Sequence, residues 1–373
     1  METNDLALLT KINSPTTMGT RLQRTTSTID LIFSNVPGST ATIEEHLTPK
    51  ARFEPPPIQI NNLVYTTDEE RAQALLTAKL ATRSAEEDIE FDLESDTSSQ
   101  HIPFEDVLSK REVEDSLLRT GNTTPGADGI TTKMLRAVWP SLGDAITLLY
   151  SSCLRLGYHP EIFRIAEVVM IPKPNKRDLS SPTAWRPISL LPCLSKGLER
   201  AIARRLAFLA IKYKIIPPKL AGALPRRLAI DIVLALIFDI ESEAFKKRLV
   251  ATLVTMDTKG AFDAVLRNRL IKRLCDQGWP RFLVKWVFSF MSLRKAYARF
   301  GIGCSGVIIL PCGLPQGSLI SPILYLLYIV AIYSLDGADR RYGYADDTAM
   351  LFIGKSLTKT TQRANEAIKQ MVE

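Results

Sequence analysis

Two adjacent aspartates, Asp346 and Asp347, lie between aromatic and apolar runs in the stretch Arg341-Tyr-Gly-Tyr-Ala-Asp-Asp-Thr-Ala-Met-Leu-Phe352. The flanks predict two short strands joined by a tight bend that carries both carboxylates. Neighbouring carboxylates repel each other and lose hydration when they are buried, so a cation usually accompanies such a pair. Mg²⁺ suits it, because this ion takes a few carboxylates together with water and substrate phosphate. The alternative is a turn that uses Asp only as a turn former.

A further carboxylate follows a continuous apolar and β-branched run, Leu249-Val-Ala-Thr-Leu-Val-Thr-Met256. The run predicts a buried strand that ends at Asp257, and a helical pattern follows from about Val265 to Asp276. Asp257 and Asp263 could both be caps or surface charges at this strand-to-helix junction. For Asp263 both roles are compatible, whereas the strand-end position of Asp257 favours a function.

A third element, Cys312-Gly-Leu-Pro-Gln-Gly-Ser318, combines glycines with a proline and leads into an apolar helix predicted at Ser318–Ser334. The glycines let the backbone approach a ligand closely, and Gln316 places a donor and an acceptor beside it. The apolar helix contains Pro322 and is short for a membrane span. It is therefore expected to be a buried core helix, and no membrane association is expected.

These three elements, in this order, resemble the palm of a reverse transcriptase of the non-LTR (LINE-like) retrotransposon type, and they look closest to fungal members. The resemblance covers roughly residues 109–373. Several blocks at compatible spacing are more specific than any single motif. The further matching blocks are Thr124-Pro-Gly-Ala-Asp-Gly-Ile130, Ile171-Pro-Lys-Pro174, Trp185-Arg-Pro-Ile-Ser-Leu-Leu191, Ser195-Lys-Gly-Leu-Glu-Arg200, Asn268-Arg-Leu-Ile-Lys-Arg-Leu274 and Gln277-Gly-Trp-Pro280.

The order of expected helices and strands predicts an α+β fold rather than a doubly wound sheet. The resemblance implies a right-hand polymerase with fingers and palm. Because the chain ends at Glu373, the thumb is expected to be absent and processive extension to be weak. Three regions are expected: an endonuclease/exonuclease/phosphatase-type remnant at 1–57, a partly helical, acidic linker at 58–108, and fingers and palm at 109–373.

The N-terminal region carries its own resemblance. Ser27-Thr-Ile-Asp-Leu-Ile-Phe-Ser-Asn35 is similar to a late strand of the apurinic-type endonuclease that precedes the polymerase in such elements. The Ser-Asp-His end of that family does not follow, since the corresponding region is Glu44-Glu-His-Leu-Thr-Pro-Lys-Ala-Arg52, so no nuclease activity is expected. Thr67–Thr82 predicts a helix, and the acidic, serine-rich stretch Ser84–Gln100 predicts a mobile linker.

The resemblance also implies the roles of the acidic residues. Asp257 and Asp346 would hold two Mg²⁺ ions, with Mn²⁺ as an alternative, and Asp347 would support a metal ion more weakly. These ions would clamp the dNTP triphosphate and the primer 3′-oxygen during nucleotidyl transfer. The ring of Phe262 would exclude a 2′-hydroxyl and so select dNTP over rNTP. The alternative for Phe262 is a plain core aromatic.

Four more residues receive nucleotide-binding roles from the resemblance. Gln316 and Gly317 would position the nucleotide and the template, whereas Lys173 and Arg186 would meet triphosphate oxygens. Arg suits this role because its guanidinium donates two parallel hydrogen bonds. The implied partners are an RNA template, a DNA primer and dNTP, and no obligate protein partner is evident.

Charge divides the chain. Residues 1–100 hold 8 Lys/Arg and 16 Asp/Glu, whereas residues 101–373 hold 39 and 24. Residues 164–227 are the most basic stretch, with 14 Lys/Arg against three acidic residues. Such a basic region suits a polyanion, here template backbone and triphosphate. The alternative, for many of its lysines, is a solvated helix surface from about Cys193 to Tyr213.

The length, the cysteines and the N-terminus of the chain indicate its domain number and its cellular compartment. With 373 residues and 46% hydrophobic content, the chain can build a large core and more than one domain. Its five cysteines show neither zinc spacing nor a disulfide framework, which indicates a reducing compartment. No signal peptide follows Met1, so an intracellular location in the nucleus or cytoplasm is expected, with an organelle left open.

Departures from the family pattern raise the question of activity. The stretch Gly222-Ala-Leu-Pro-Arg-Arg-Leu-Ala-Ile-Asp231 resembles a block usually written Gly-Ala-Leu-Pro-Gly-Arg-Ser-Ala-Thr-Asp. Arg226 and Leu228 thus replace a backbone-permissive glycine and a helix-capping hydroxyl, and Ile230 replaces a threonine. Such changes suggest a decaying genomic copy. Two functions stay open: an RNA-directed DNA polymerase domain, or a catalytically silent nucleic-acid-binding remnant. A group II intron maturase is disfavoured by the endonuclease-like strand.

Overall fold

The computed structural model describes residues 55–82, 84–174, 176, 178–258 and 260–372. These residues form two compact units. The smaller unit comprises residues 217–258 and 329–372, and the larger unit comprises the described residues of 55–216 and 260–328. The endonuclease-like strand predicted at Ser27–Asn35 lies outside the described residues.

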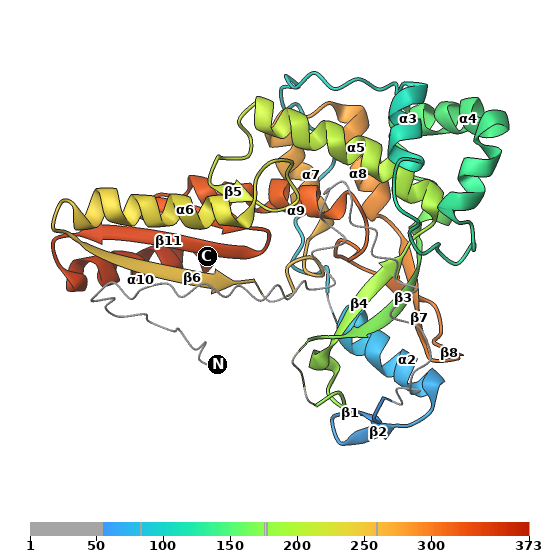
Figure 1. Ribbon diagram of the computed structural model, residues 1–373, viewed down its shortest axis with the longest axis horizontal. Helices are drawn as coiled ribbons and strands as arrows, with labels where there is room; N and C mark the ends of the chain where they lie inside the picture. The colour runs from blue at the N-terminus through green and yellow to red at the C-terminus, as the bar shows by residue number, and fades with distance from the viewer. Residues whose placement is uncertain (1–54, 83, 175, 177, 259, 373) are drawn as a thin grey trace, which may run out of the picture. The chain divides into compact units, whose positions relative to one another are not determined.

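A five-stranded sheet forms the centre of the larger unit (Figure 1). The strand β3 runs antiparallel to β4 and parallel to β7, which also pairs with β8 and β9. Side chains of β7 alternate between buried and more exposed positions, as expected for a strand with one face against a core. The bounds are β3 (Ile165–Pro172), β4 (Trp185–Leu190), β7 (Arg294–Phe300), β8 (Gly303–Cys304) and β9 (Ile308–Leu310).

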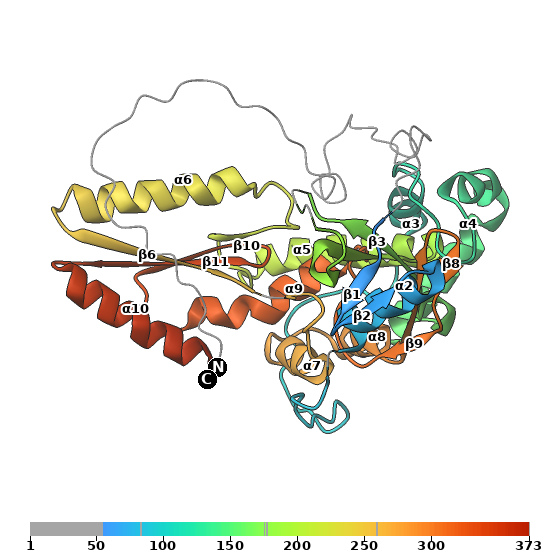
Figure 2. The ribbon, with the colours of Figure 1, turned by 90° about the horizontal axis from the view of Figure 1, so that it is seen from below.

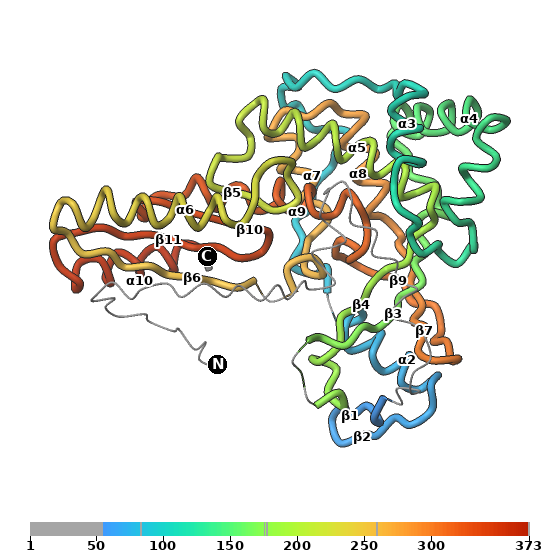
Figure 3. The backbone as a smooth tube through the Cα atoms, viewed as in Figure 1, coloured from blue at the N-terminus to red at the C-terminus, as the bar shows by residue number. Residues whose placement is uncertain are grey.

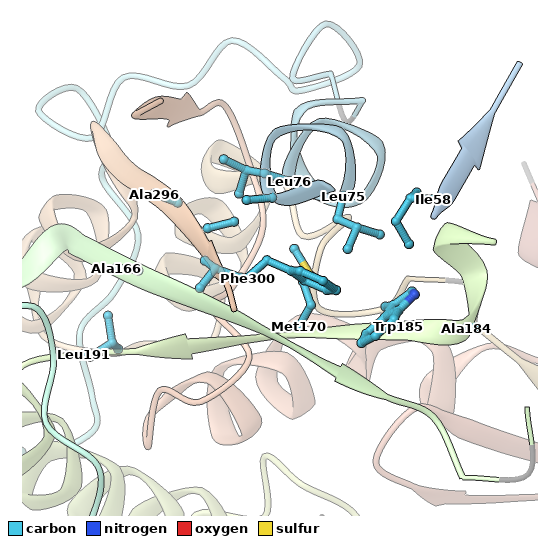
Figure 4. Close-up of a cluster of buried hydrophobic side chains, with 13 residues drawn as sticks. Ile58, Leu75, Leu76, Ala166, Met170, Ala184, Trp185, Leu191, Ala296 and Phe300 are labelled. Carbon is cyan, nitrogen blue, oxygen red and sulfur yellow. The ribbon is translucent and has the colours of Figure 1, made fainter. Parts of the chain in front are cut away.

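The residues just after the proline run pack into the core of this sheet. They form the hairpin β1 (Ile58–Ile60) and β2 (Leu63–Tyr65), then α2 (Asp68–Leu76) and a π-helical turn, Thr77–Ala81. A capping box between Thr67 and Glu70 begins α2, and the predicted helix at Thr67–Thr82 is confirmed. Side chains from the hairpin, helix and strands meet in one cluster (Figure 4), which includes Ile58, Leu75, Leu76, Met170, Trp185 and Phe300.

Helices α3, α4, α5 and α8 gather at the end of the larger unit away from β1 and β2 (Figure 1). Close packing there depends on Gly197 in α5, where an added Cβ would lie 2.5 Å from the Tyr150 hydroxyl and 2.7 Å from Leu117 Cδ1. The bounds are α3 (Lys110–Leu117), α4 (Thr132–Arg155), α5 (Cys193–Lys212), α7 (Arg267–Asp276), α8 (Arg281–Met291) and α9 (Ser321–Ile329), with 3₁₀ turns at Glu161–Arg164 and Pro182–Ala184.

The acidic stretch expected to be a mobile linker follows a fixed course along α7 and α8. The Asp88 carboxylate accepts hydrogen bonds from the backbone amides of Asn268 and Arg269, in the first turn of α7. Glu94 forms an ion pair with Lys285 of α8 at 2.7 Å. A carboxylate at a helix N-terminus accepts hydrogen bonds from amides that have no partner within the helix. The acidic residues of this stretch therefore attach it to α7 and α8.

A four-stranded sheet with the order β5-β10-β11-β6 forms the smaller unit. Helices α6 and α10 lie on opposite faces of this sheet (Figure 2). Met350 and Phe352 of β11 pack with Ala364 and Ala367 of α10. The bounds are β5 (Leu220–Ala221), α6 (Ala229–Asp239), a π-helical turn (Ile240–Phe245), β6 (Val250–Asp257), a 3₁₀ turn (Val330–Ser334), β10 (Arg340–Tyr344), β11 (Asp347–Gly354) and α10 (Leu357–Val372).

The structure confirms the predicted α+β class. The strand expected at Leu249–Met256 is β6, and the apolar helix after the glycine-rich loop is the buried helix α9. Within the described residues, no helix has the length and apolar character needed to cross a membrane.

Candidate active site

The acidic pair lies at the turn between β10 and β11. Figure 3 shows these two strands as a hairpin. Tyr344 and Asp347 pair across a two-residue loop formed by Ala345 and Asp346. Such short loops favour a positive φ at their first residue, and Ala345 adopts φ +54° there. Since alanine carries a Cβ, this conformation is strained, which is common where a turn holds functional groups.

The neighbouring segment fixes this turn. The Ala345 amide donates to the carbonyl of Ala221 in β5 at 3.0 Å. Gly222 has φ +94°, and a Cβ added to it would lie 2.6 Å from the Ala345 nitrogen. Only glycine therefore allows this close approach between the end of β5 and the acidic turn.

Asp257 lies opposite Asp347 in the antiparallel register of β6 and β11. Residues directly opposite in such a pair have Cβ atoms about 4.5–5.5 Å apart. Partial burial, followed by the charges of Asp346 and Asp257, raises the pKa of Asp347 above its ordinary value. The register thus brings the three predicted acidic residues to one end of the sheet.

The chemistry of these donors fits a hard divalent cation. Mg²⁺ takes carboxylate oxygens and keeps several of its waters, so it needs few protein ligands. A cation would also offset the repulsion that raises the pKa of Asp347. Across the part of the chain that the structure describes, no group of three or more His, Cys, Asp or Glu side chains already converges as a metal site.

The glycine-rich loop of the larger unit carries Gln316 and Gly317. The Gln316 amide nitrogen donates to both carboxylate oxygens of Asp263, at 3.1 and 3.2 Å. The backbone carbonyl of Gln316 accepts a hydrogen bond from the backbone amide of Ser189 in β4 at 2.6 Å. Gly317 has φ +120°, and a Cβ there would lie 2.4 Å from the Ser189 carbonyl oxygen. A glycine is therefore required at position 317 for packing, as well as for any close approach of a ligand.

Phe262 belongs to the larger unit, and its ring stacks on that of Tyr325 with centroids 5.0 Å apart and an interplanar angle of 26°. The Phe262 carbonyl accepts the Leu314 amide at 2.7 Å, which joins this residue to the loop that carries Gln316. The ring is only partly buried. Its place beside the acidic residues, which belong to the smaller unit, stays a prediction.

Lys173 and Arg186 lie at the same end of the β3–β4 pair. Lys173 directly follows β3, and its amide donates to the Ala184 carbonyl at 2.7 Å. Arg186 pairs with Ile171 across the two strands. The structure thus places both predicted triphosphate-binding residues at one end of a pair of adjoining strands, Arg186 within β4 and Lys173 directly after β3.

Residues 171–373 match the family described as "Reverse transcriptase (RNA-dependent DNA polymerase)". The chain belongs to this reverse transcriptase family. The match includes the acidic residues of β6 and of the β10–β11 turn, as well as the loop with Gln316.

Relatives of this reverse transcriptase chain include the "RNA-directed DNA polymerase from mobile element jockey" of Drosophila funebris, 30% identical over 67% of this chain and 28% of the relative. The "Probable RNA-directed DNA polymerase from transposon BS" of Drosophila melanogaster is 30% identical over 61% of this chain and 26% of the relative. The chain therefore spans about a quarter of the length of these relatives. A solved structure of apo telomerase from Candida tropicalis aligns with a TM-score of 0.40 and 10% identity, over 62% of this chain and 51% of that one.

Two residues of this reverse transcriptase chain gain importance only from the structure. Asp263, which the sequence also allowed as a cap, is the partner of Gln316. Lys79 of the N-terminal segment lies in the field of Lys173 and Asp263, and burial, followed by the Lys173 charge, lowers its pKa to about 8. Sequence offered no signal for Lys79, since its neighbours come from distant parts of the chain.

Proposed function

We propose that this chain is the fingers and palm portion of an RNA-directed DNA polymerase from a non-LTR retrotransposon. It would transfer a nucleotide from dNTP to the 3′-hydroxyl of a DNA primer on an RNA template. The observation that carries the proposal is the register of Asp257 opposite Asp347, beside Asp346, in a chain of the reverse transcriptase family. The relatives from mobile elements support the non-LTR type, and the fungal affinity stays a prediction.

The carboxylates of Asp257, Asp346 and Asp347 would hold Mg²⁺, or Mn²⁺ in its place. Bound divalent ions would supply charge neutralisation at the triphosphate and lower the pKa of the primer hydroxyl. The chain's own part is to hold the reactants in place, because misplacement by about 1 Å can cost on the order of 100-fold in rate.

The larger unit would position the nucleotide. Lys173 and Arg186 would neutralise triphosphate charge, and Phe262 would lie against the sugar and exclude a 2′-hydroxyl. Gln316 and Gly317 would align the base and template, with Gln316 held in place by Asp263. We place the activity inside the cell, in the nucleus or cytoplasm, where the template RNA and dNTP are found.

Primer extension tests this proposal. An oligo(dT) primer on poly(A) template, with dTTP and Mg²⁺, should be extended, and chelation should stop it. Asp257→Asn and Asp346→Asn should each lower the rate by about 100-fold or more, since metal-based charge stabilisation amounts to several kcal/mol. Glu366→Gln, an exposed change on α10, is the matched control and should leave the rate unchanged.

A catalytically silent nucleic-acid-binding remnant is the second candidate, and a specific observation favours it. Arg226 adopts φ +60°, and Leu228 begins α6 without a side-chain hydrogen bond to the helix amides. The strained backbone at Arg226 and the missing cap at Leu228 both lower the stability of the smaller unit, which carries the acidic residues. Binding of the primer–template without any metal-dependent extension by the wild-type chain would support this candidate over the first.

A further inference from the structure

Glu199 of α5 is a fully buried carboxylate, with 0% of its surface exposed. Its Oε1 accepts the Ser195 hydroxyl at 2.7 Å, and its Oε2 accepts both the Ser318 hydroxyl and the Leu319 amide, the latter at 3.0 Å. A buried charge is tolerated only when it is paired or well hydrogen-bonded. Two of its three donors come from the segment just before α9, far away in sequence.

These two donors directly follow Gln316 and Gly317. The Ser318 hydroxyl also accepts the Ser321 amide at 3.3 Å, so the same group caps α9. The loop is therefore fixed at three points. Asp263 holds the Gln316 side chain, Ser189 holds its carbonyl, and Glu199 holds the two residues that come after Gly317.

Two side chains with shifted pKa values, Arg294 and His159, lie around Glu199 and its partner Ser195. Arg294 of β7, only 2% exposed, lies in its field, and two of the three guanidinium nitrogens have no hydrogen-bond partner among the described residues. Burial lowers the pKa of Arg294 to about 10, and the Glu199 charge opposes this shift. On the other side, the Ser195 hydroxyl lies 3.5 Å from His159 Nε2. Burial, followed by the charges of Arg294 and Arg164, lowers the pKa of His159 well below its ordinary value, so the ring stays neutral.

We infer that Glu199 is a positioning residue for nucleotide addition, which sets the place of Gln316 and Gly317 by holding Ser318 and Leu319. Glu199 would act through its hydrogen bonds to the loop and would contact neither nucleotide nor template. The inference rests on the proposed function, because it assigns Gln316 and Gly317 to nucleotide positioning. The hydrogen bonds of Glu199 to the loop do not depend on that assignment, so they can be tested separately.

The test uses a matched pair of hydroxyl deletions and one isosteric charge deletion. Ser318→Ala and Ser195→Ala each remove one hydroxyl donor from the same carboxylate, but only Ser318 belongs to the loop. Glu199→Gln keeps the side-chain volume and removes the charge. Hydrogen exchange of the peptide covering residues 316–321, compared with peptides from α5, reports the loop directly and requires no activity.

We expect Glu199→Gln and Ser318→Ala to speed exchange in residues 316–321 by about tenfold or more, since hydrogen bonds to a charged group are stronger than those between neutral groups. Ser195→Ala should leave that peptide close to wild type. In single-nucleotide incorporation, Glu199→Gln and Ser318→Ala should raise KM for dTTP by roughly tenfold, which corresponds to about 1.4 kcal/mol. They should change kcat less, because a displaced loop weakens nucleotide binding in the ground state and the transition state alike.

Two outcomes would overturn the inference. One is unchanged exchange in residues 316–321 in the Ser318→Ala protein; the other is equal acceleration by Ser195→Ala and Ser318→Ala, which would indicate general loosening. If Glu199→Gln does not fold, the serine pair still decides when exchange is read at the Leu319 amide, which donates to Glu199, and not at the Ser321 amide, which donates to Ser318 itself. If the wild-type protein incorporates no nucleotide, the proposed function fails, and the exchange comparison still decides whether Glu199 holds the loop.

Discussion

Asp257 and Asp347 face each other across the β6–β11 pair, at the end of the sheet where Asp346 forms the turn. Like charges directly opposite in a sheet destabilise it by up to about 1 kcal/mol. Without metal, Asp257→Asn should therefore raise the free energy of unfolding by about 0.5–1 kcal/mol. With Mg²⁺, the wild-type protein should gain stability and the variant should gain much less.

Urea unfolding with and without Mg²⁺ measures both effects. Glu366→Gln removes a carboxylate from the same unit without touching the acidic turn, and it should respond to Mg²⁺ as the wild type does. Equal Mg²⁺ stabilisation of wild type and Asp257→Asn would exclude Asp257 as a ligand.

Gly222 should tolerate no side chain. An alanine there would bring its Cβ to 2.6 Å from the Ala345 nitrogen, and φ +94° is itself unfavourable for alanine. We expect Gly222→Ala to lower the free energy of unfolding by about 1–3 kcal/mol and to displace the acidic turn. Gly121→Ala is the control, since nothing lies within 4 Å of its added Cβ. Similar unfolding midpoints for the two variants would argue against the close approach.

Restoring two residues of the family pattern should stabilise the smaller unit. Arg226 has φ +60°, so Arg226→Gly removes a strain of about 1 kcal/mol. At the start of α6, the Asp231 carboxylate accepts the Leu228 amide at 2.8 Å, which is one half of a capping box. Leu228→Ser would supply the hydroxyl for the other half and add about 0.5–2 kcal/mol.

Thermal or urea unfolding of the two single variants and the double variant checks this. Leu228→Ala is the matched control, because it removes the exposed leucine without adding a cap. No gain of Leu228→Ser over Leu228→Ala would contradict the capping argument.

Local pattern was enough to predict the elements that carry the acidic residues. The aromatic and apolar runs on either side of Asp346 and Asp347 predicted the hairpin, and the apolar run before Asp257 predicted β6. Pairing between these elements was a different matter. They lie about 90 residues apart in the chain, and a register that places Asp257 opposite Asp347 depends on tertiary packing.

Buried polar groups were the hardest to predict. The helix with Glu199 has a basic sequence, which is compatible with a solvated surface, yet Lys196 and Glu199 are buried in α5. Their partners, such as the Leu319 amide, lie up to 120 residues away. The acidic stretch with Asp88 has the composition of a mobile linker, but its carboxylate caps α7. Composition indicates that burying such polar and charged groups is unfavourable. The hydrogen-bond partners that make the burial possible come from distant parts of the chain, and only the fold shows them.

Phe262 provides a test of nucleotide selection. If its ring lies against the sugar, Phe262→Ala should raise the ratio of rNTP to dNTP incorporation by about 10- to 100-fold, because a steric clash of a few kcal/mol disappears. Tyr325 stacks on the same ring and is almost fully buried. Tyr325→Phe keeps the stack and serves as the control. An unchanged ratio in Phe262→Ala would show that the ring is only a packing residue.

Binding to nucleic acid should depend on salt less steeply than the basic stretch at residues 164–227 suggests. Within the described part of the chain, seven of its fourteen Lys and Arg side chains already donate to protein oxygens or pair with carboxylates. They are Arg164, Lys196, Arg200, Arg204, Arg205, Lys219 and Arg227. With about 0.9 counterions released per phosphate contact, fourteen contacts would give a log–log slope of roughly −13 on duplex DNA, whereas the remaining seven give at most about −6.

The slope is measured from dissociation constants of a DNA duplex over a series of salt concentrations. Lys212→Gln, an exposed change at the end of α5, should make the slope shallower by about 1 if Lys212 contacts phosphate. Arg205→Gln removes the same charge but acts on a side chain already paired with Glu112 at 2.8 Å, so the slope should stay the same. A wild-type slope near −13, or an Arg205→Gln effect equal to that of Lys212→Gln, would show that the internal pairs open on binding and that the whole basic stretch reaches the phosphates.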